Sequence, residues 1–490
     1  MASRSRFLQV TVAALTALAA GCLQSPNPTT SEVFVGRYAD NTSFQPFKNT
    51  SGSNVSADAT VCYPDATLYC PDGGASVKVT VPGAGNPANA FAGGTFVSGL
   101  PRNLTGYDAV TFYAKSTRPA PIVIGLGNDN SGNSLYPAEW NTTLGTTWTQ
   151  YVLPIPLPVK LDSEKGLFLF SAGALGSPAV GFTFWLAGIQ YVTLGNALGS
   201  PTPVFGAACV DRAVGDALFP FPSTGSDKIP VTFAVNEAKQ FINASRRYFT
   251  FSSSDPAVAT VDVDGRVSVQ GAGTAVVSAR LGGIEAVGPM TVHVNGQACP
   301  PMAVPTEIAP TPRPPRDNVI SLFNSSRKYQ DVQVDQWQTS WSVCCNDYVE
   351  TPITTPTGLS AVVKKYNLRS FAGISFGADN PVPPNARNNA IDASQMTHFH
   401  LDVWTPNGFV FKVRLVNDPG QAPVHFQSES TVQVDAVSTT PLETGKWVGV
   451  EIPMTDFINL GGTSKLGQML FLVPDGTSGT FYVDNIYFHN

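Results

Sequence analysis

The chain has 490 residues, of which 43% are hydrophobic and 13% are charged; this fits about three domains with buried cores and excludes a disordered chain. The formal net charge is −6 and no basic run occurs, which excludes nucleic acid and anionic membrane surfaces as partners. The 44 glycines and 40 prolines favour turn-rich β-structure over long helices.

Residues 1–22 have the pattern of an export signal. Arg4 and Arg6 precede an apolar stretch that ends at Ala20. This stretch is too short to span a bilayer, which needs about 20 residues. We therefore expect the protein to be exported.

The end of this signal resembles a bacterial lipobox, in which a cysteine is lipidated and becomes the mature N-terminus. The matching residues are Ala19-Ala20-Gly21-Cys22, although Leu18 lies one position earlier than the family's leucine. The resemblance implies lipidation at Cys22, and Leu23 in place of aspartate favours the bacterial outer membrane or cell surface. Residues 23–32 would form a tether, and the lipid would be the sole membrane contact. An ordinary secretory signal is the alternative.

Six further cysteines are consistent with an oxidising compartment. Six cysteines allow 15 pairings, so the connectivity stays open from the sequence alone. Cys209 and Cys299 flank one candidate domain, and adjacent Cys344 and Cys345 could form a vicinal disulfide or remain as two thiols. The expected disulfides are Cys62–Cys70, Cys209–Cys299 and Cys344–Cys345.

The chain divides into three units, at residues 33–195, 207–299 and 316–490. Residues 300–315 contain seven prolines in sixteen positions, which predicts a semi-rigid extended linker. Short runs of alternating polarity, such as Val110–Ala114, indicate strands with one buried face.

The two outer units share an order of matching segments. Met396–Asp418 aligns without a gap with Tyr107–Asp129, and both segments end in Leu-x-Asn-Asp. Trp447 and Trp148 begin another matching pair of strands further along. We interpret this as an internal duplication, with the middle unit inserted between the copies.

The middle unit contains Phe251-Ser-Ser-Ser-Asp-Pro-Ala-Val-Ala-Thr-Val261, followed by Gly271-Ala-Gly-Thr-Ala275. These segments resemble the signature of the bacterial immunoglobulin-like domain, group 2. The resemblance implies an immunoglobulin-like β-sandwich that acts as a spacer and contributes no catalytic residue.

The C-terminal unit contains Trp337-Gln-Thr-Ser-Trp341 and ends in Tyr482-Val-Asp-Asn-Ile-Tyr-Phe488. It resembles the carbohydrate-binding modules appended to family 16 glycoside hydrolases, and the N-terminal unit shares this resemblance more faintly. The implied fold is all-β, with two jelly-roll (galactose-binding-like) β-sandwiches flanking one immunoglobulin-like β-sandwich. The implied partner is a polysaccharide or cell-surface glycan.

The segment His398–Trp404 predicts the ligand-binding face. Period two places His398, His400, Asp402 and Trp404 together on one side of this strand, and Arg414 of the next strand was expected to join them. Hydrogen-bonding groups beside a flat ring suit sugar binding. A solvated face with ion pairs is the alternative, and a zinc site on the two histidines is a further one.

Three more assignments follow from comparing the copies. Trp337 and Trp341 have no aromatic counterpart and are expected to be further ligand platforms, whereas Trp148 and Trp447 coincide and are expected in the cores. Asp484 resembles the acidic ligand of a structural calcium in related sandwiches; the alternative is a strand-end aspartate that accepts backbone hydrogen bonds. No other cofactor is expected.

The sequence favours a non-catalytic protein. Gly373-Ile-Ser-Phe-Gly377 matches a nucleophile-elbow pattern, but no helix follows it and the other copy has Thr95 in place of Ser375. The catalytic carboxylate motif of family 16 hydrolases is missing. The expected function is polysaccharide binding, with β-glucan as one candidate. The alternatives are a structural or adhesive surface protein, and a glycoside hydrolase with an unrecognised site.

Overall fold

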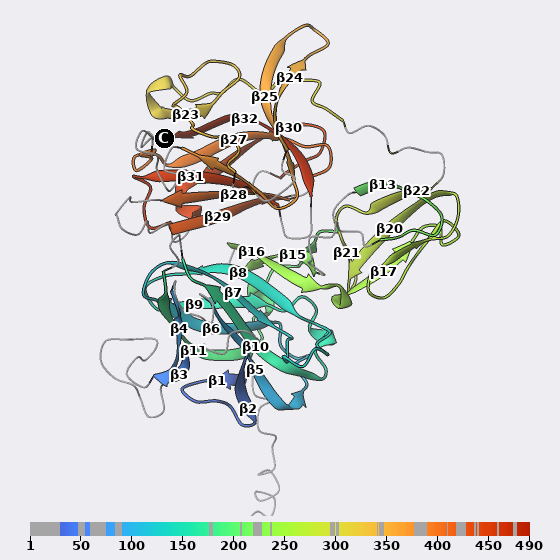
Figure 1. Cartoon of the computed structure of the whole chain (residues 1–490), viewed down its shortest axis with the longest axis vertical. Helices are drawn as coiled ribbons and strands as arrows, with labels where there is room; N and C mark the ends of the chain where they lie inside the picture. The colour runs from blue at the N-terminus through green and yellow to red at the C-terminus, as the bar shows by residue number, and fades with distance from the viewer. Residues whose placement is uncertain are drawn as a thin grey trace, which may run out of the picture.

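The chain is all-β in this computed structural model (Figure 1). The structure describes residues 30–47, 54–58, 75–83, 91–175, 180–205, 208–218, 228–235, 238–294, 299, 303–340, 342, 347–376, 390–408, 410–417, 428–435, 438, 441–457, 460–473 and 478–490. Within these residues the helical segments are five short 3-10 turns, at Pro158–Lys160, Gly195–Ala197, Arg246–Tyr248, Arg316–Asn318 and Met454–Asp456. No described helix is long and apolar enough to cross a membrane.

The N-terminal unit is a sandwich of two sheets. Sheet N1 has the order β3-β4-β11-β6-β9, with β1 also paired to β11, and sheet N2 has the order β12-β15-β16-β8-β7-β10-β5-β2. Phe112 of sheet N1 meets Phe168 of sheet N2 edge to face in the core, at 5.2 Å between ring centroids. The strands are β1 (Thr30–Phe34), β2 (Thr42–Pro46), β3 (Asn54–Asp58), β4 (Ser76–Val81), β5 (Phe91–Arg102), β6 (Ala109–Ser116), β7 (Ala120–Leu126), β8 (Ala138–Leu144), β9 (Thr149–Pro154), β10 (Glu164–Gly173), β11 (Phe182–Val192), β12 (Thr202–Pro203), β15 (Lys228–Val235) and β16 (Ala238–Ser245).

The C-terminal unit is a second sandwich. Sheet C1 has the order β24-β25-β32-β27-β30, with β23 also paired to β32, and sheet C2 has the order β26-β31-β28-β29. Tyr366 of sheet C1 packs against Phe471 of sheet C2, at 5.2 Å between ring centroids. The strands are β23 (Val319–Phe323), β24 (Asp347–Thr354), β25 (Ser360–Leu368), β26 (Phe371–Ser375), β27 (His398–Trp404), β28 (Val410–Asn417), β29 (Ser428–Asp435), β30 (Trp447–Pro453), β31 (Leu466–Leu472) and β32 (Gly479–His489).

The two sandwiches have the same topology, as the predicted duplication requires. Sheets N1 and C1 have the same strand order, and in each the first strand of the unit also pairs with the central strand of the sheet, β11 or β32. Both first strands change register at the equivalent point, between Glu32 and Phe34 in one copy and between Ser321 and Phe323 in the other. Sheet C2 corresponds to the β5-β10-β7-β8 part of sheet N2.

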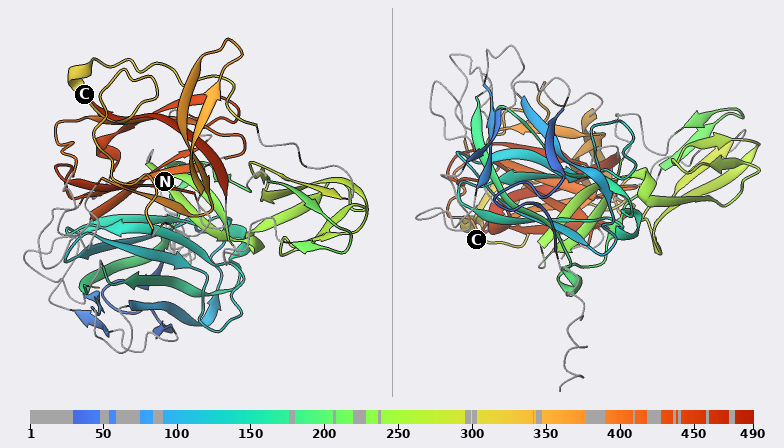
Figure 2. Two further views of the ribbon diagram at one scale, coloured as in Figure 1. Left: turned by 45° about the horizontal axis from the view of Figure 1, so that its top comes forward. Right: turned by 90° about the horizontal axis from the view of Figure 1, so that it is seen from below.

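The middle unit forms an immunoglobulin-like sandwich. One sheet has the order β13-β22-β20-β17, with β21 paired to β20, and the other has the order β14-β19-β18. These strands project beside the two stacked outer sandwiches (Figures 1 and 2). The strands are β13 (Ala208–Arg212), β14 (Ala217–Leu218), β17 (Phe249–Ser253), β18 (Ala259–Val261), β19 (Val267–Val269), β20 (Gly273–Leu281), β21 (Ile284–Glu285) and β22 (Met290–Val294).

The predicted middle unit, 207–299, does not fold only on itself. Its hairpin β15–β16 extends sheet N2, because β16 pairs with β8 through Ile242 and Trp140. The ion pair between Lys228 Nζ and Glu139 Oε2, at 2.6 Å, supports this junction. Pairing between strands about 100 residues apart in the sequence leaves no local pattern, so the sequence assigned the hairpin to the nearer domain.

The hairpin also contacts the C-terminal sandwich. Gln433 Nε2 of β29 donates to Thr232 Oγ1 of β15 at 3.5 Å, and Lys412 Nζ of β28 lies 5.2 Å from the ring centroid of Phe241 in β16. Sheets N2 and C2 therefore face one another, and both views of Figure 2 show the two outer sandwiches stacked. The outer sandwiches form one packed body rather than separate modules on a linker.

The disulfide Cys209–Cys299 is present, as predicted, with 5.8 Å between the Cα atoms. It joins the two ends of the middle unit, which lie side by side because β13 and β22 pair in parallel. The other two predicted pairs, Cys62–Cys70 and Cys344–Cys345, lie outside the described residues, as does Cys22.

We expect reduction of this disulfide to lower the stability of the immunoglobulin-like sandwich by up to about 4–5 kcal/mol, because the bond closes a loop of 90 residues in the unfolded chain. Calorimetry of Cys209→Ser, compared with Ser254→Ala in the same sandwich, measures the effect. An unchanged melting temperature in the cysteine variant would contradict it.

Candidate functional site

Strand β27 divides its side chains between core and outer face as the alternation predicts. Phe399, Leu401 and Val403 are fully buried in the C-terminal core. His398, His400, Asp402 and Trp404 therefore lie together on the outer face of sheet C1.

This outer face is covered, so the expected open ligand platform is wrong. Trp404 is 4% exposed and belongs to a second, smaller hydrophobic cluster that lies outside sheet C1. The other members of this cluster are Ile353, Val363 and Tyr482, with Trp447 packed against them. Trp404 thus contributes to packing, and its indole meets Tyr482 edge to face at 5.4 Å.

The cover is the proline-rich segment 303–315, which we call the strap. Trp447 Nε1 donates to the Glu307 carbonyl at 2.7 Å, and Asn485 Nδ2 donates to the Pro310 carbonyl at 2.7 Å. Tyr329 Oη donates to the Pro314 carbonyl, also at 2.7 Å. The predicted linker is therefore docked: its extended backbone presents carbonyl groups at intervals to donors on the sheet.

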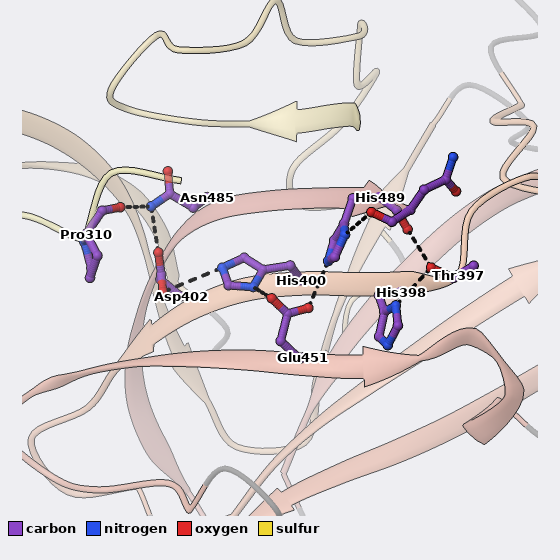
Figure 3. A network of polar contacts seen from close by, with 9 residues as sticks. Pro310, Thr397, His398, His400, Asp402, Glu451, Asn485 and His489 are labelled. Atoms are coloured by element: carbon purple, nitrogen blue, oxygen red, sulfur yellow. Dashed lines mark hydrogen bonds and ion pairs between the residues drawn. The ribbon is translucent and has the colours of Figure 1, made fainter. Parts of the chain in front are cut away.

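A polar network lies beneath the strap (Figure 3). Glu451 accepts hydrogen bonds from His400 Nδ1 at 2.7 Å and from His489 Nε2 at 2.9 Å. His400 Nε2 lies 3.6 Å from Asp402 Oδ1, and Asp402 Oδ2 accepts from Asn485 Nδ2 at 2.6 Å. Because Asn485 also binds Pro310, the network connects the strap to sheet C1.

Two carboxylates determine the protonation of His400. Burial lowers the pKa of this imidazole, but the hydrogen bonds and charges of Asp402 and Glu451 outweigh it and raise the pKa to about 9. His400 is therefore charged at neutral pH: Nδ1 donates a hydrogen bond to Glu451, and Nε2 forms an ion pair with Asp402. These ion pairs agree with the alternative interpretation of the outer face of β27, in which its polar side chains pair with one another and do not bind a ligand.

We expect the C-terminal sandwich to lose stability as the pH rises from about 6.5 to about 9. Below the ordinary pKa of 6.5 both states bind the proton and the stabilisation is complete; it is lost as the pH rises through the folded pKa of about 9. This difference corresponds to roughly 3 kcal/mol. Urea unfolding across this range should show the loss in the wild type and in Thr397→Val but not in His400→Gln; a flat wild-type profile would contradict it.

Arg414 does not join this face. It lies in β28, which belongs to sheet C2, whereas β27 belongs to sheet C1. Its guanidinium donates to Glu429 Oε1 and to Thr431 Oγ1, both at 2.9 Å on neighbouring β29. The expectation failed because the chain crosses between sheets after β27, and two alternating strands in succession look alike whether they share a sheet or not.

Trp337 packs over a buried lysine. Lys364 is 1% exposed, and its ammonium lies 4.0 Å from the Trp337 ring centroid and 4.2 Å from that of Phe323. Glu350 Oε1 pairs with this ammonium at 3.1 Å, although burial still lowers the lysine pKa. Trp337 is therefore occupied within the protein rather than free as a ligand platform, and Trp341 lies outside the described residues.

Asp484 does not fit a calcium ligand. It is fully buried, and its carboxylate accepts hydrogen bonds from Ser325 N at 2.9 Å, from Asn485 N at 2.7 Å and from Ser325 Oγ. Burial raises its pKa to about 6. Since N–H and O–H donors face both oxygens, the backbone-bonding alternative describes this residue.

Among the described side chains, one group has residue types and spacing that could hold a metal ion: Cys209, His293 and Cys299. Both of these cysteines are joined in the disulfide, so they cannot act as thiolate ligands. His398 and His400 are not in this group; His398 Nδ1 instead contacts Thr397 Oγ1 at 2.9 Å. The alternative of a zinc site on β27 is not supported.

Sheet N1 carries the open counterpart of the covered cluster. Lys78 on β4, Trp185 on β11 and Lys115 on β6 lie opposite one another across the strands. Trp148 comes directly before Thr149, which pairs with Ala114, and therefore lies opposite Lys115. We call Lys78, Trp185, Lys115 and Trp148 the N-terminal row; all four side chains are partly exposed.

Lys115 is the centre of this row. Its ammonium lies 5.1 Å from the ring centroid of Trp185 and 5.4 Å from that of Trp148. Neighbouring strands lie about 4.8 Å apart, so the two indoles are about 10 Å apart on the outer face. Two aromatic rings and two ammonium groups thus form one band across the sheet.

The C-terminal row occupies the same four positions and consists of Lys365, Tyr482, Trp404 and Trp447. The duplication therefore produced two equivalent rows, one partly exposed and one under the strap. Trp404 stands at the position of Lys115, so the covered row has one cation fewer.

The prediction that Trp148 and Trp447 lie in the cores is wrong, since both residues lie on outer faces and are only partly buried. Their coincidence in the two copies reflects a shared row rather than a shared core. The same alternation identifies Trp185, because its neighbours Phe184 and Leu186 are fully buried and it must face outward. The alternation of buried and exposed side chains along this segment is therefore the sequence signal that identifies Trp185.

The fold and these rows define a class: an all-β protein with two duplicated jelly-roll sandwiches and an inserted immunoglobulin-like sandwich. A family model described as "Intimin, immunoglobulin-like domain" matches residues 235–282. The match runs from the end of β15 to β20 and thus includes a strand of sheet N2. No curated protein matches the chain.

Several solved carbohydrate-binding modules are similar to part of the chain. A family 11 module from Clostridium thermocellum, in complex with a β-1,3-1,4-mixed-linked tetrasaccharide, is 14% identical over 35% of this chain and 96% of its own, with a TM-score of 0.24. A family 30 module of a cellulosomal cellulase of the same organism is 15% identical over 35% of this chain and 97% of its own, with a TM-score of 0.25. A family 29 module variant is 14% identical over 34% and 92%, with a TM-score of 0.21.

Proposed function

We propose that this chain is a non-catalytic bacterial surface protein that binds polysaccharide through the N-terminal row. The observation that carries the proposal is the band of Trp185, Lys115 and Trp148 on a partly exposed sheet face. A sugar ring combines apolar C–H faces with hydroxyl groups, so a binding site needs aromatic surface beside hydrogen-bond donors. The row supplies both on a rigid sheet.

The proposed binding face therefore lies on sheet N1 and not on β27 of sheet C1. The C-terminal row has the same position in its sandwich, but Trp404 and Tyr482 are buried and Trp447 is bonded to the strap. An oligosaccharide could reach these rings only by displacing the strap. To reach the N-terminal row, an oligosaccharide need not displace any described segment of the chain.

The remaining parts of the chain have supporting roles in the proposal. Lipidation at Cys22 and the tether at residues 23–32 would hold the sandwiches at the outer membrane or cell surface. The immunoglobulin-like sandwich projects to the side of the packed outer sandwiches (Figure 2), so the expected role as a spacer between them does not form part of the proposal.

Affinity electrophoresis of the full chain with Cys22→Ser, which prevents lipidation, tests the proposal. We expect retardation in gels that contain soluble polysaccharides, with β-glucans, galactans and polygalacturonate as first probes. Migration unchanged by any polysaccharide would overturn sugar binding and favour a structural or adhesive surface protein. Release of reducing sugar from a bound polysaccharide would overturn the non-catalytic part and favour a glycoside hydrolase.

A further inference from the structure

The N-terminal row holds two lysines that have no acidic partner among the described side chains. Among the described residues, Lys78 and Lys115 make no ion pair or hydrogen bond to another side chain, and the contacts of Lys115 are with the indoles of Trp148 and Trp185. Lys228, by contrast, pairs with a carboxylate at 2.6 Å. No described carboxylate therefore compensates Lys115, the central cation of the row, in a chain whose net charge is −6.

Lys115, at the centre of the row, is farther from acidic residues than Lys78, because Asp58 of the neighbouring strand β3 pairs in register with Ser76, two residues from Lys78. Among the described acidic side chains of sheet N1, Glu32 faces outward and pairs in register with Gln190. Gln190 is five residues from Trp185 along β11, which corresponds to about 15 Å. This exceeds the screening length of about 8 Å at physiological salt.

We infer that the ligand of the N-terminal row is an anionic polysaccharide, whose carboxylate or sulfate groups pair with Lys115 and Lys78 while its sugar rings lie against Trp148 and Trp185. This inference rests on the proposed function and specifies its ligand class. A neutral glycan has no need of two ammonium groups, since hydroxyls are served equally by amide side chains that both donate and accept. An anionic group beside Lys115 gains a charge-assisted hydrogen bond at the centre of the band.

The covered row supports this interpretation. Trp404 replaces the central cation there, and the row is used for packing under the strap. Lys365 remains at the edge, with its ammonium 5.7 Å from the Tyr482 ring centroid. The copy with the open row is therefore also the copy with a cation between its aromatic rings.

The test compares polygalacturonate with its carboxyl-reduced form, so that the backbone is the same and the charge differs. We expect the full chain to bind the acidic form at least tenfold more tightly, with an affinity that falls as NaCl is added. Lys115→Gln should lose this tenfold preference, whereas Lys365→Gln, at the edge of the covered row, should keep it. Dextran sulfate against dextran distinguishes sulfate from carboxylate as the anionic group.

The outcomes separate this inference from the proposed function. Equal affinity for charged and reduced forms of both polysaccharides, or an unchanged preference in Lys115→Gln, would overturn the anionic ligand. If neutral polysaccharides then bind and Trp185→Ala abolishes that binding, the proposed site stands and only the ligand class is wrong. If no polysaccharide of either kind binds the wild type, both are wrong.

Discussion

Trp404→Ala is expected to destabilise the C-terminal sandwich by about 3–5 kcal/mol, as for a large aromatic removed from a packed cluster. The indole is 4% exposed and packs with Ile353, Val363 and Tyr482 on the outer face of sheet C1, beside Trp447, which is hydrogen-bonded to the strap. Its loss would leave a cavity that the strap, with its fixed proline geometry, is poorly able to fill. Chemical denaturation followed by fluorescence measures the effect.

Leu359→Ala is the matched control for this substitution. Leu359 lies in the same sandwich, between β24 and β25, but is 57% exposed, so its truncation should cost no more than about 0.5 kcal/mol. Trp404→Ala should also make the strap more susceptible to a glutamyl endopeptidase at Glu307, which lies within it and is followed by Ile308. A loss below about 1 kcal/mol, with unchanged proteolysis, would show that the strap does not cover this cluster in solution.

Trp185→Ala is expected to reduce polysaccharide affinity by about 30-fold or more while leaving the unfolding free energy within about 0.5 kcal/mol. Aromatic residues at the centre of a binding face commonly contribute about 2 kcal/mol or more, which corresponds to this factor. The side chain is partly exposed on the outer face of sheet N1 and is absent from the core cluster, so the fold does not depend on it. Affinity electrophoresis and thermal unfolding measure the two quantities.

The duplication supplies a matched pair of controls. Trp148 and Trp447 are equivalent residues of the open and covered rows. Trp148→Ala should lower affinity without a change in stability, whereas Trp447→Ala should lower stability through the lost hydrogen bond to Glu307 and leave affinity unchanged. The reverse result would place the binding face on the C-terminal sandwich, as first expected.

Period-two alternation alone determined much of this protein. It predicted which side chains of β27 face the core, and the order of matched segments predicted two sandwiches of one topology. These features are local, because the direction of each side chain along a strand depends on its neighbours in the sequence. The pair Cys209 and Cys299 was also predictable, since the two residues flank a recognisable domain.

Only the tertiary structure decided which faces are open. Whether His400, Asp402 and Trp404 meet solvent depends on the strap, and an extended proline-rich segment reads the same in sequence whether it is free or docked. The assignment of Arg414 to another sheet and of β15–β16 to sheet N2 depends on pairing between distant strands. Such pairing is selected by complementarity of whole surfaces, for which no short stretch of sequence carries a signal.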